Sequence, residues 1–259
     1  KKDNFKINKK INFLIEGNSP LIMVKSTGLA IIEIANCFSE LKPDIVLTIG
    51  DRYETISTAI AAAYMNIPLA HTMGGEISGT IDESVRHAVT KFSNIHFTAT
   101  KNAKKNVIKM GENKRNVFNT GCPRVDEVKE ILSKKIDNNE INREINKNGV
   151  GDYIDISKPF ITIMFHPVTS EFGNAELQIK NILSAINKFK VQKIFFWPNS
   201  DAGYEDISRG IRKWREKKGD KNTRYIKNLE QKFFYHILNN HNQLFLWAYT
   251  LLLYISIFH

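Results

Sequence analysis

Two carboxylates and two histidines follow short apolar runs of this sequence, where they could transfer protons. Asp51 comes just after one apolar run, Glu76 stands in a Gly-Gly-Glu turn, and His71 and His166 each end a run. Carboxylates combined with histidine, without a recognisable metal or cofactor motif, are suited to removing and returning a proton at carbon. The residue types therefore indicate acid–base chemistry, without naming a substrate.

Some of these residues also have a purely structural interpretation. Asp51 could cap the N-terminus of a helix, with Glu54 three residues later as its partner. Thr80 could cap the next helix while Glu83 reaches back to its backbone. Against this, Glu83 and His87 lie four residues apart on one helical face that can point into a cleft. The sequence leaves both alternatives open.

Other polar residues near the predicted strand ends have weaker chemical signals. Asn199 and Asp201 occur in a Pro-Asn-Ser-Asp-Ala-Gly loop, where either could form an Asx-turn. His96 lies inside an apolar run, which favours a packed core position. Cys122 precedes a proline, and no neighbour in sequence would activate it, so it is interpreted as a packing residue.

The elements that would position these residues alternate between strands and helices. Strands are predicted at 44–49, 67–70, 95–98, 117–119, 160–165 and 193–197, and helices at 52–65, 81–92, 101–110, 125–132, 176–189 and 204–217. This alternation predicts an α/β fold with parallel sheets and crossover helices. The polar stretch 133–158 interrupts the pattern and is predicted to be a linker. We therefore expect two Rossmann-like domains, at 1–158 and 159–259.

Composition and charge exclude several classes of protein. The chain has 259 residues, of which 42% are hydrophobic and 25% charged, which is typical of globular domains. Its net charge of +10 is regional, because residues 1–10 contribute +4 and residues 209–232 contribute +7. No nucleic-acid-binding motif accompanies these stretches, so we expect no nucleic-acid partner. The two cysteines suggest a reducing compartment, and without GxGxxG, P-loop or metal-ligand spacing we expect no cofactor and no metal.

Both ends of the sequence are unusual. The first residue is Lys1, and no signal-peptide pattern follows it. The segment 244–258 is almost wholly apolar, but its 15 residues fall short of the roughly 18 to 20 that span a bilayer. We expect a buried terminal helix or the product of a shifted reading frame there, and no membrane association.

Five ordered strings resemble one enzyme family. They are GDRYE, HTMGGEISGTIDESVRHAVTKFSNIHF, FNTGCP, MFHPVTSE and WPNSDAG. Over about residues 21–230 the chain resembles the hydrolysing UDP-N-acetylglucosamine 2-epimerases that supply N-acetylmannosamine for sialic-acid-type sugars. The resemblance implies a cytoplasmic enzyme of the glycosyltransferase-B fold, with the UDP-sugar bound between two Rossmann-like domains. The implied reaction removes the C2 proton, eliminates UDP to give a glycal, and adds water.

The resemblance also implies roles for particular residues, and to these we add His71 from its place at a strand end. The catalytic group comprises Asp51, Glu76, Asp82 (as a substitute for Glu83), Glu83 and His166, and the substrate-binding group comprises Arg52, His71, Asn199, Asp201 and Gly203. The proton transfers are assigned to the acidic group as a whole.

Two departures from the family pattern bear on activity. A Gly-Thr-Arg loop expected near the start is absent, and after about His241 the chain lacks a Gly-Asn-Ser-Ser-Ser-Gly-Ile-Arg-Glu phosphate loop. We therefore expect both domains to be incomplete and the sequence as given to have little epimerase activity. A catalytically inactive fragment, an epimerase of the UDP-diacetylbacillosamine type and a homo-oligomer are alternatives that the sequence leaves open.

Overall fold

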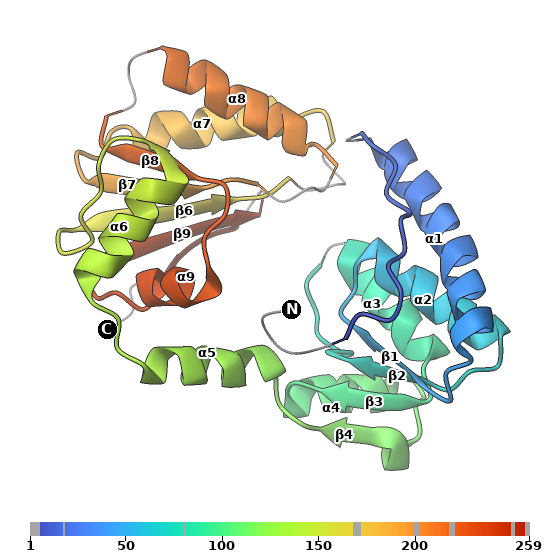
Figure 1. Cartoon of the computed structure of the whole chain (residues 1–259). Helices are drawn as coiled ribbons and strands as arrows, with labels where there is room; N and C mark the ends of the chain where they lie inside the picture. The colour runs from blue at the N-terminus through green and yellow to red at the C-terminus, as the bar shows by residue number, and fades with distance from the viewer. Residues whose placement is uncertain are drawn as a thin grey trace. The chain divides into compact units, whose positions relative to one another are not determined.

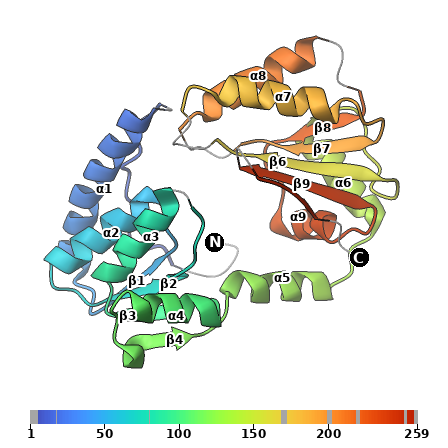
Figure 2. The same ribbon diagram turned by 180° about the vertical axis from the view of Figure 1, so that it is seen from behind.

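The chain forms two compact units, Lys1–Val125 (unit 1) and Asp126–His259 (unit 2). The computed structural model describes residues 6–17, 19–79, 81–167, 172–198, 202–217, 221–249 and 252–256. Each unit is built around its own β-sheet (Figures 1 and 2).

Unit 1 is a parallel sheet with crossover helices. Its elements are α1 (Pro20–Leu41), β1 (Val46–Ile49), α2 (Tyr53–Tyr64), β2 (Leu69–Thr72), α3 (Ile81–Phe92), β3 (Ile95–Thr98), α4 (Lys101–Lys109), the short 3-10 helix η1 (Lys114–Asn116) and β4 (Val117–Asn119). The strands pair in the order β1-β2-β3-β4, and every pair is parallel. The helix α5 (Pro123–Ser133) contains the division between the two units.

The helix α1, which the sequence analysis does not predict, is long and apolar enough to cross a membrane by length and composition alone. In unit 1 it packs against α2, where Ala30 and Ile34 of α1 and Ala61 of α2 form a buried cluster. Ser19 caps its first turn, because the Ser19 side chain accepts a hydrogen bond from the backbone of Ile22. These contacts account for α1 as an element of unit 1.

Unit 2 is a sheet with helices on both faces. Its elements are α6 (Asn138–Asn148), β5 (Gly149–Gly151), β6 (Phe160–Phe165), α7 (Ala175–Ile186), β7 (Gln192–Phe196), α8 (Tyr204–Glu216), β8 (Thr223–Ile226), α9 (Gln231–Leu238), β9 (Gln243–Tyr249) and β10 (Leu252–Ser256). The strand order is β10-β9-β6-β7-β8-β5. The four central strands β9, β6, β7 and β8 are parallel to one another, and the edge strands β10 and β5 pair antiparallel with β9 and β8.

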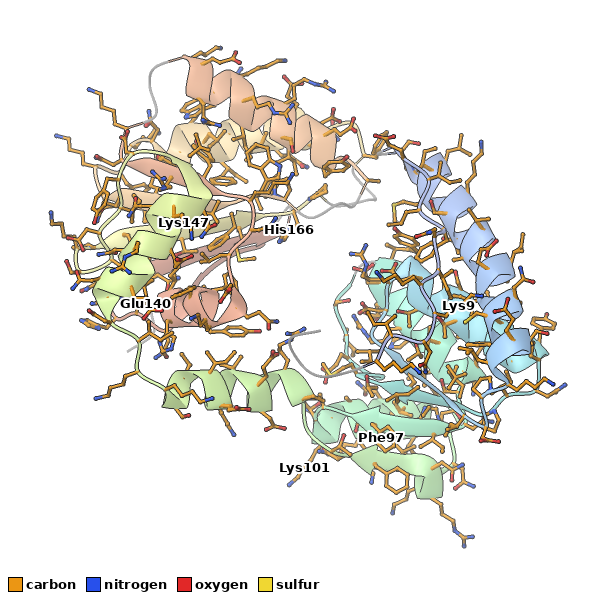
Figure 3. All side chains as sticks on the ribbon, viewed as in Figure 1. Lys9, Phe97, Lys101, Glu140, Lys147 and His166 are labelled. Atoms are coloured by element: carbon orange, nitrogen blue, oxygen red, sulfur yellow. The ribbon has the colours of Figure 1, made fainter. Side chains whose placement is uncertain are left out.

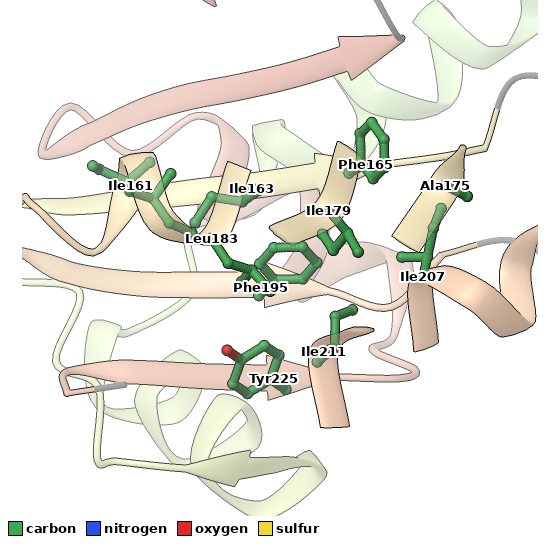
Figure 4. Close-up of a cluster of buried hydrophobic side chains, with 11 residues drawn as sticks. Ile161, Ile163, Phe165, Ala175, Ile179, Leu183, Phe195, Ile207, Ile211 and Tyr225 are labelled. Atoms are coloured by element: carbon green, nitrogen blue, oxygen red, sulfur yellow. The ribbon is translucent and has the colours of Figure 1, made fainter. Parts of the chain in front are cut away.

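Alternate residues of the unit 2 strands pack into two separate cores. Ile163 of β6 and Phe195 of β7 face α7 and α8, in the cluster of Figure 4. Phe160 of β6 and Ile194 of β7 instead pack with α6 and α9. Because successive side chains of a strand point to opposite faces, apolar strands of this kind need a cover on both sides.

The predicted alternation of strands and helices is confirmed, but the predicted linker at 133–158 is wrong. This segment contains α6 and β5, and β5 pairs with β8 in the sheet of unit 2. Ile141 and Ile145 lie in the core, and the Asn142 and Asn146 side chains bond the backbone of the segment that follows. The division between units therefore lies earlier in the chain than the boundary predicted at residue 158.

The predicted terminal helix at 244–258 is also wrong. The described residues of this segment form the strands β9 and β10, and β9 pairs in parallel with β6. An apolar run of this length is typical of a buried helix, but it also accommodates two successive strands, here of 7 and 5 residues.

Arg224 of β8 fastens α6 to the sheet. Its guanidinium donates to five backbone carbonyls, those of Ile145, Asn146, Gly149, Gly151 and Asp152. The first two belong to the last turn of α6, whose carbonyls have no partner within the helix. A single cation therefore satisfies the end of α6 and both ends of β5.

We expect the substitution Arg224→Ala to destabilise unit 2 by about 2–4 kcal/mol, because several carbonyl groups lose their partner together. Arg224→Lys should recover only part of this loss, since an ammonium group cannot reach five carbonyls. Urea unfolding followed by circular dichroism measures the effect, with Arg143→Ala on the exposed face of α6 as the control. A cost for Arg224→Ala equal to that of the control would contradict this role.

Candidate active site

The candidate residues of unit 1 lie at one edge of its sheet. Asp51, Glu76 and Thr100 follow β1, β2 and β3, which are neighbouring parallel strands. The carboxyl ends of parallel strands share one edge, which is where ligands bind in open α/β sheets.

Arg86 of α3 connects two of the predicted residues. Its Nε atom donates to Asp51 Oδ2 at 2.9 Å, and its Nη2 atom bonds the same oxygen. Its Nη1 atom donates to the backbone oxygen of Glu76 at 2.5 Å, and Nη2 also reaches the Ser78 hydroxyl at 3.4 Å. The Arg86 side chain is 9% exposed and that of Asp51 27%. The turn after β1 and the turn after β2 are therefore held together by one buried guanidinium.

Asp51 does not cap α2, so the helix-capping interpretation of this residue is wrong. Arg52 occupies the N-cap position of α2, and no side chain bonds that cap. Arg52 Nε donates to Glu54 Oε1 at 2.9 Å, and its guanidinium lies over the Tyr53 ring. Asp51 is thus paired with α3 in place of capping α2.

His71 lies beneath the same turn. It is fully buried, and its Nε2 atom lies 2.8 Å from the Gly50 carbonyl oxygen, so Nε2 carries the proton of a neutral ring. Burial lowers the pKa of His71 to about 4, although the bond to Gly50 acts in the opposite direction. The structure therefore gives His71 a positioning role behind Asp51, whereas the predicted contact with substrate would need an exposed ring.

Two glycines allow the turn that carries Glu76 to pack closely. A Cβ atom on Gly75 would lie 2.3 Å from the carbonyl oxygen of Ala103 in α4, and one on Gly74 would lie 2.9 Å from the Thr90 hydroxyl. The half-buried Glu76 then accepts a hydrogen bond from the Thr100 hydroxyl at 3.2 Å. Thr100 is also the N-cap of α4, so Glu76 lies at a helix N-terminus, where negative charge is favoured.

Glu83 fixes the loop between Glu76 and α3. Its Oε2 atom accepts hydrogen bonds from the backbone N–H groups of Ser78 and Gly79, each at 2.6 Å, and these bonds lower the pKa of Glu83. Asp82 is half-buried in the first turn of α3. Glu83 thus bonds the backbone of Ser78 and Gly79. The predicted bond to the backbone of Thr80 falls on a residue outside the described ones and stays a prediction.

In unit 2, His166 is the first residue after β6, where Figure 3 shows it. The strands β7 and β8 extend the sheet on one side of β6, and β9 lies on the other side. The chain thus reverses its direction of winding between β6 and β9, and ligands of doubly wound sheets bind at such a switch point. The half-buried His166 is therefore placed where the fold favours a ligand.

Gly203 brings the start of α8 against the turn after β6. Its φ is 96°, and a Cβ atom there would lie 3.2 Å from that of Pro167, next to His166. Asn199 and Asp201 lie outside the described residues. The prediction that Asp51, Glu76 and His166 line one cleft concerns both units and stays a prediction.

Sequence reasoning missed the importance of Arg86 and Thr100. Arg86 was visible only as a basic residue beside Glu83, and a threonine after a strand is an ordinary helix cap. The spacing of Glu83, Arg86 and Thr90 on one face of α3 is the signal that could have indicated a polar face turned toward the sheet. In the described part of the chain, no group of three or more metal-binding side chains is present.

Comparison with known proteins identifies the family. Residues 1–244 match the profile of the UDP-N-acetylglucosamine 2-epimerase family, and the chain belongs to this family. It is 34% identical to the hydrolysing UDP-N,N'-diacetylbacillosamine 2-epimerase of Legionella pneumophila, over 84% of this chain and 55% of the relative. It is 35% identical to the polysialic acid biosynthesis protein P7 of Escherichia coli, over 81% of this chain and 52% of that protein. The chain spans about half the length of the curated relatives it matches.

Solved structures share the fold. The UDP-GlcNAc 2-epimerase of Neisseria meningitidis, bound to UDP-GlcNAc, matches with a TM-score of 0.72 at 20% identity, over 92% of this chain and 62% of that one. The enzyme of Methanocaldococcus jannaschii, in complex with UDP-GlcNAc and UDP, matches with a TM-score of 0.68 at 20% identity, over 87% and 60%. The predicted α/β fold of glycosyltransferase-B type is thereby confirmed.

The substitution Arg86→Ala should destabilise the chain by about 3–5 kcal/mol, because it leaves the partly buried Asp51 carboxylate without its cation. Combined with Asp51→Asn, a double-mutant cycle should give a coupling energy of about 1–3 kcal/mol. Urea unfolding measures both quantities, with the exposed Arg115→Ala as the control. Additive effects of the two substitutions would show that the pair does not organise this edge.

The buried neutral His71 should make stability depend on pH. Its native pKa of about 4 lies below the 6.5 of an unperturbed histidine, so between these values the unfolded chain binds a proton that the native chain does not. The contribution of neutral His71 to the free energy of unfolding is therefore fully present above pH 6.5. It should fall by about 3 kcal/mol as the pH decreases to 4. His71→Gln should remove most of this part of the pH dependence, which urea unfolding at a series of pH values measures. A remaining dependence is expected from His96, whose pKa is also lowered by burial. Direct NMR titration provides a second check, and a His71 midpoint near 6.5 would contradict the prediction.

Proposed function

We propose that this protein is a hydrolysing UDP-N-acetylglucosamine 2-epimerase, which converts UDP-GlcNAc and water into N-acetylmannosamine and UDP. The observation that carries the proposal is the edge of unit 1, where Arg86 binds Asp51 and the backbone of Glu76 in a chain of this family. Carboxylates held at the carboxyl edge of a parallel sheet are suited to proton transfer at a bound sugar.

The reaction needs proton transfers on two faces of one carbon atom. A carboxylate takes the C2 proton, the C2–H electron pair forms the C1–C2 double bond, and the C1–O bond to UDP breaks. Water then adds its oxygen to C1 and gives up one proton to a carboxylate, while C2 accepts a proton from a protonated carboxyl group on the opposite face. We assign these transfers to the group formed by Asp51, Glu76 and Glu83, with Asp82 as the substitute for Glu83.

Binding of the nucleotide is proposed for the other predicted residues. His166, at the switch point of unit 2, would lie near the departing phosphate. Arg52, held by Glu54, and the loop that contains Asn199, Asp201 and Gly203 would bind the substrate. We propose no metal or nicotinamide cofactor for this chemistry.

A second substrate is favoured by the names of two relatives. The proteins of Legionella pneumophila and Campylobacter jejuni, each 34% identical to this chain, are named as epimerases of diacetylbacillosamine nucleotides. The relative from Neisseria meningitidis named as a UDP-N-acetylglucosamine 2-epimerase is 29% identical. We therefore keep UDP-diacetylbacillosamine as the alternative substrate.

We also propose that the protein acts in the cytoplasm, without nucleic acid or membrane as a partner. Support comes from the nucleotide sugar that the proposed reaction consumes and from Cys37 and Cys122, which are both unpaired thiols. A homo-oligomer is a further proposal.

In a full-length version of this protein, the substitution Glu76→Gln should lower turnover by about 10²–10⁴-fold, because a general acid or base typically contributes that much. UDP affinity should change little, since the amide keeps the shape of the side chain. The measurements are UDP release from each of the two UDP-sugars and deuterium incorporation at C2 in heavy water. Glu130→Gln on the exposed surface of α5 is the control.

Three outcomes decide between the proposals. An equal loss of turnover and UDP affinity in Glu76→Gln would move Glu76 from chemistry to binding. Turnover of only the diacetylated sugar would replace the first substrate by the second. The sequence as given is expected to release little UDP, so the deciding measurement is made on a full-length version, and no UDP release from either sugar by that version would refute the proposed activity.

A further inference from the structure

Thr100 lies where the acidic edge of unit 1 meets the N-terminus of α4, next to Lys101, which Figure 3 labels. Its hydroxyl oxygen accepts a hydrogen bond from the backbone N–H of Ala103 at 3.0 Å, and its hydroxyl group donates one to Glu76 Oε1 at 3.2 Å. A hydroxyl group has a single proton. The helix cap uses the oxygen of Thr100, so that proton is left for the Glu76 carboxylate.

The backbone of the turn that carries Glu76 is held at two successive carbonyl groups. Asn106 Nδ2 of α4 donates to the Gly75 carbonyl oxygen at 2.9 Å, and Arg86 Nη1 of α3 donates to the Glu76 carbonyl oxygen at 2.5 Å. These two bonds leave the side-chain torsions of Glu76 free. Among the described residues, Thr100 alone hydrogen-bonds the Glu76 side chain, so Thr100 is the group that limits this remaining freedom.

The two carboxylate oxygens of Glu76 have different surroundings. Oε1 accepts the hydrogen bond from Thr100, whereas Oε2 has no hydrogen-bond partner among the described residues. Oε2 is also not one of the buried side-chain atoms that lack a partner, so it keeps surface that a ligand can reach. A donated hydrogen bond stabilises negative charge on the oxygen that accepts it. The oxygen that is both open and more ready to take a proton is therefore Oε2.

We propose that Thr100 is a positioning residue, which holds Glu76 Oε1 so that Oε2 is the atom that exchanges a proton with the sugar. The inference rests on the proposed function, because it assigns Oε2 to a proton transfer at C2. The proton that leaves or reaches C2 is carried on Oε2. The Thr100 proton stays on its own oxygen and remains donated to Oε1, so Thr100 does not itself react.

The first test measures UDP release by a full-length version that carries Thr100→Val. Its kcat should fall by about tenfold, as expected for one hydrogen bond to a charged group, while KM changes by less than about twofold. The loss falls on kcat because Glu76 acts in the transition state. Thr100→Ser keeps the hydroxyl group and should restore most of the turnover. An unchanged kcat in Thr100→Val, or a Thr100→Ser variant as slow as Thr100→Val, would overturn the proposal.

A second pair of variants separates this role from the capping of α4. Thr100→Asp keeps a preferred cap but has no proton to donate at neutral pH, so Tm should stay within about 1 °C while kcat falls as in Thr100→Val. Thr100→Val also loses the cap, which should lower its Tm by about 2–4 °C. The control Ser19→Ala removes the hydroxyl cap of α1 and should lower Tm without changing kcat. If kcat follows Tm across these variants, Thr100 supports only the fold of α4 and the proposal fails.

A spectroscopic measurement on the chain as given distinguishes this proposal from the proposed function. With isotope label at the glutamate side-chain carboxyl carbons, the NMR signal of Glu76 is assigned by its loss in Glu76→Gln. This signal should shift in Thr100→Val and keep its position in Thr100→Ser and Ser19→Ala. An unshifted signal in Thr100→Val would overturn the positioning role without any measurement of activity. A shifted signal, combined with no UDP release by the full-length version, would instead show that the proposed activity fails, and the assignment of Oε2 with it.

Discussion

The candidate active site depends on one buried arginine. Arg86 lies in the middle of α3, and its guanidinium reaches the Asp51 carboxylate, the Glu76 carbonyl and the Ser78 hydroxyl. A cation in this position is unfavourable unless its donors are satisfied, because burial removes its hydration. Satisfying them requires that the turns after β1 and β2 converge on α3. The arrangement of the acidic edge therefore follows from the need to pair this one side chain, and the planar fork of arginine meets that need better than the point charge of lysine does.

The other contacts in unit 1 remove the remaining freedom of these turns. His71 is neutral and holds the Gly50 carbonyl from below, Glu83 holds the N–H groups of Ser78 and Gly79, and Thr100 bonds the Glu76 carboxylate. Gly74 and Gly75 permit this packing, since a side chain on Gly75 would meet α4. The turns that carry Asp51 and Glu76 are thus each held at two points, by Arg86 of α3 together with His71 of β2 and the N-cap residue Thr100 of α4. Such fixed placement is what general acid–base chemistry requires, because misplacement of a reacting group by an ångström can cost a large part of the rate.

The sequence predicts the parts of the fold that depend on local pattern. Short apolar runs followed by helical periodicity identify every strand from β1 to β4, together with β6 and β7, and the residues after them.

The prediction is wrong where the role of a residue depends on contacts with residues far away along the chain. The Asn-rich segment 133–158 has the composition of a linker, but Asn142 and Asn146 bind backbone groups of residues 154 and 156, while Ile141 and Ile145 enter the core. Arg86 and Arg224 resemble solvated charges in sequence, because their importance comes from backbone carbonyls and a carboxylate far away along the chain.

The acidic edge of unit 1 is preorganised by that unit alone. Every contact that places Asp51, Glu76 and Glu83 in the described structure, from Arg86, His71, Thr100 and the glycines, comes from within residues 50–107. Forming this edge therefore requires no ordering of unit 2, and the entropic cost of fixing the carboxylates is met when unit 1 folds. In the proposed reaction, a sugar would meet groups that are already in place, so its binding energy would be available for orienting the reacting carbon. The position of His166 is instead determined by contacts within unit 2. It depends on the strand order of that unit and on the packing of Gly203 against Pro167. The two halves of the proposed site are thus specified by separate cores, and a substitution in one core should leave the geometry of the other half intact.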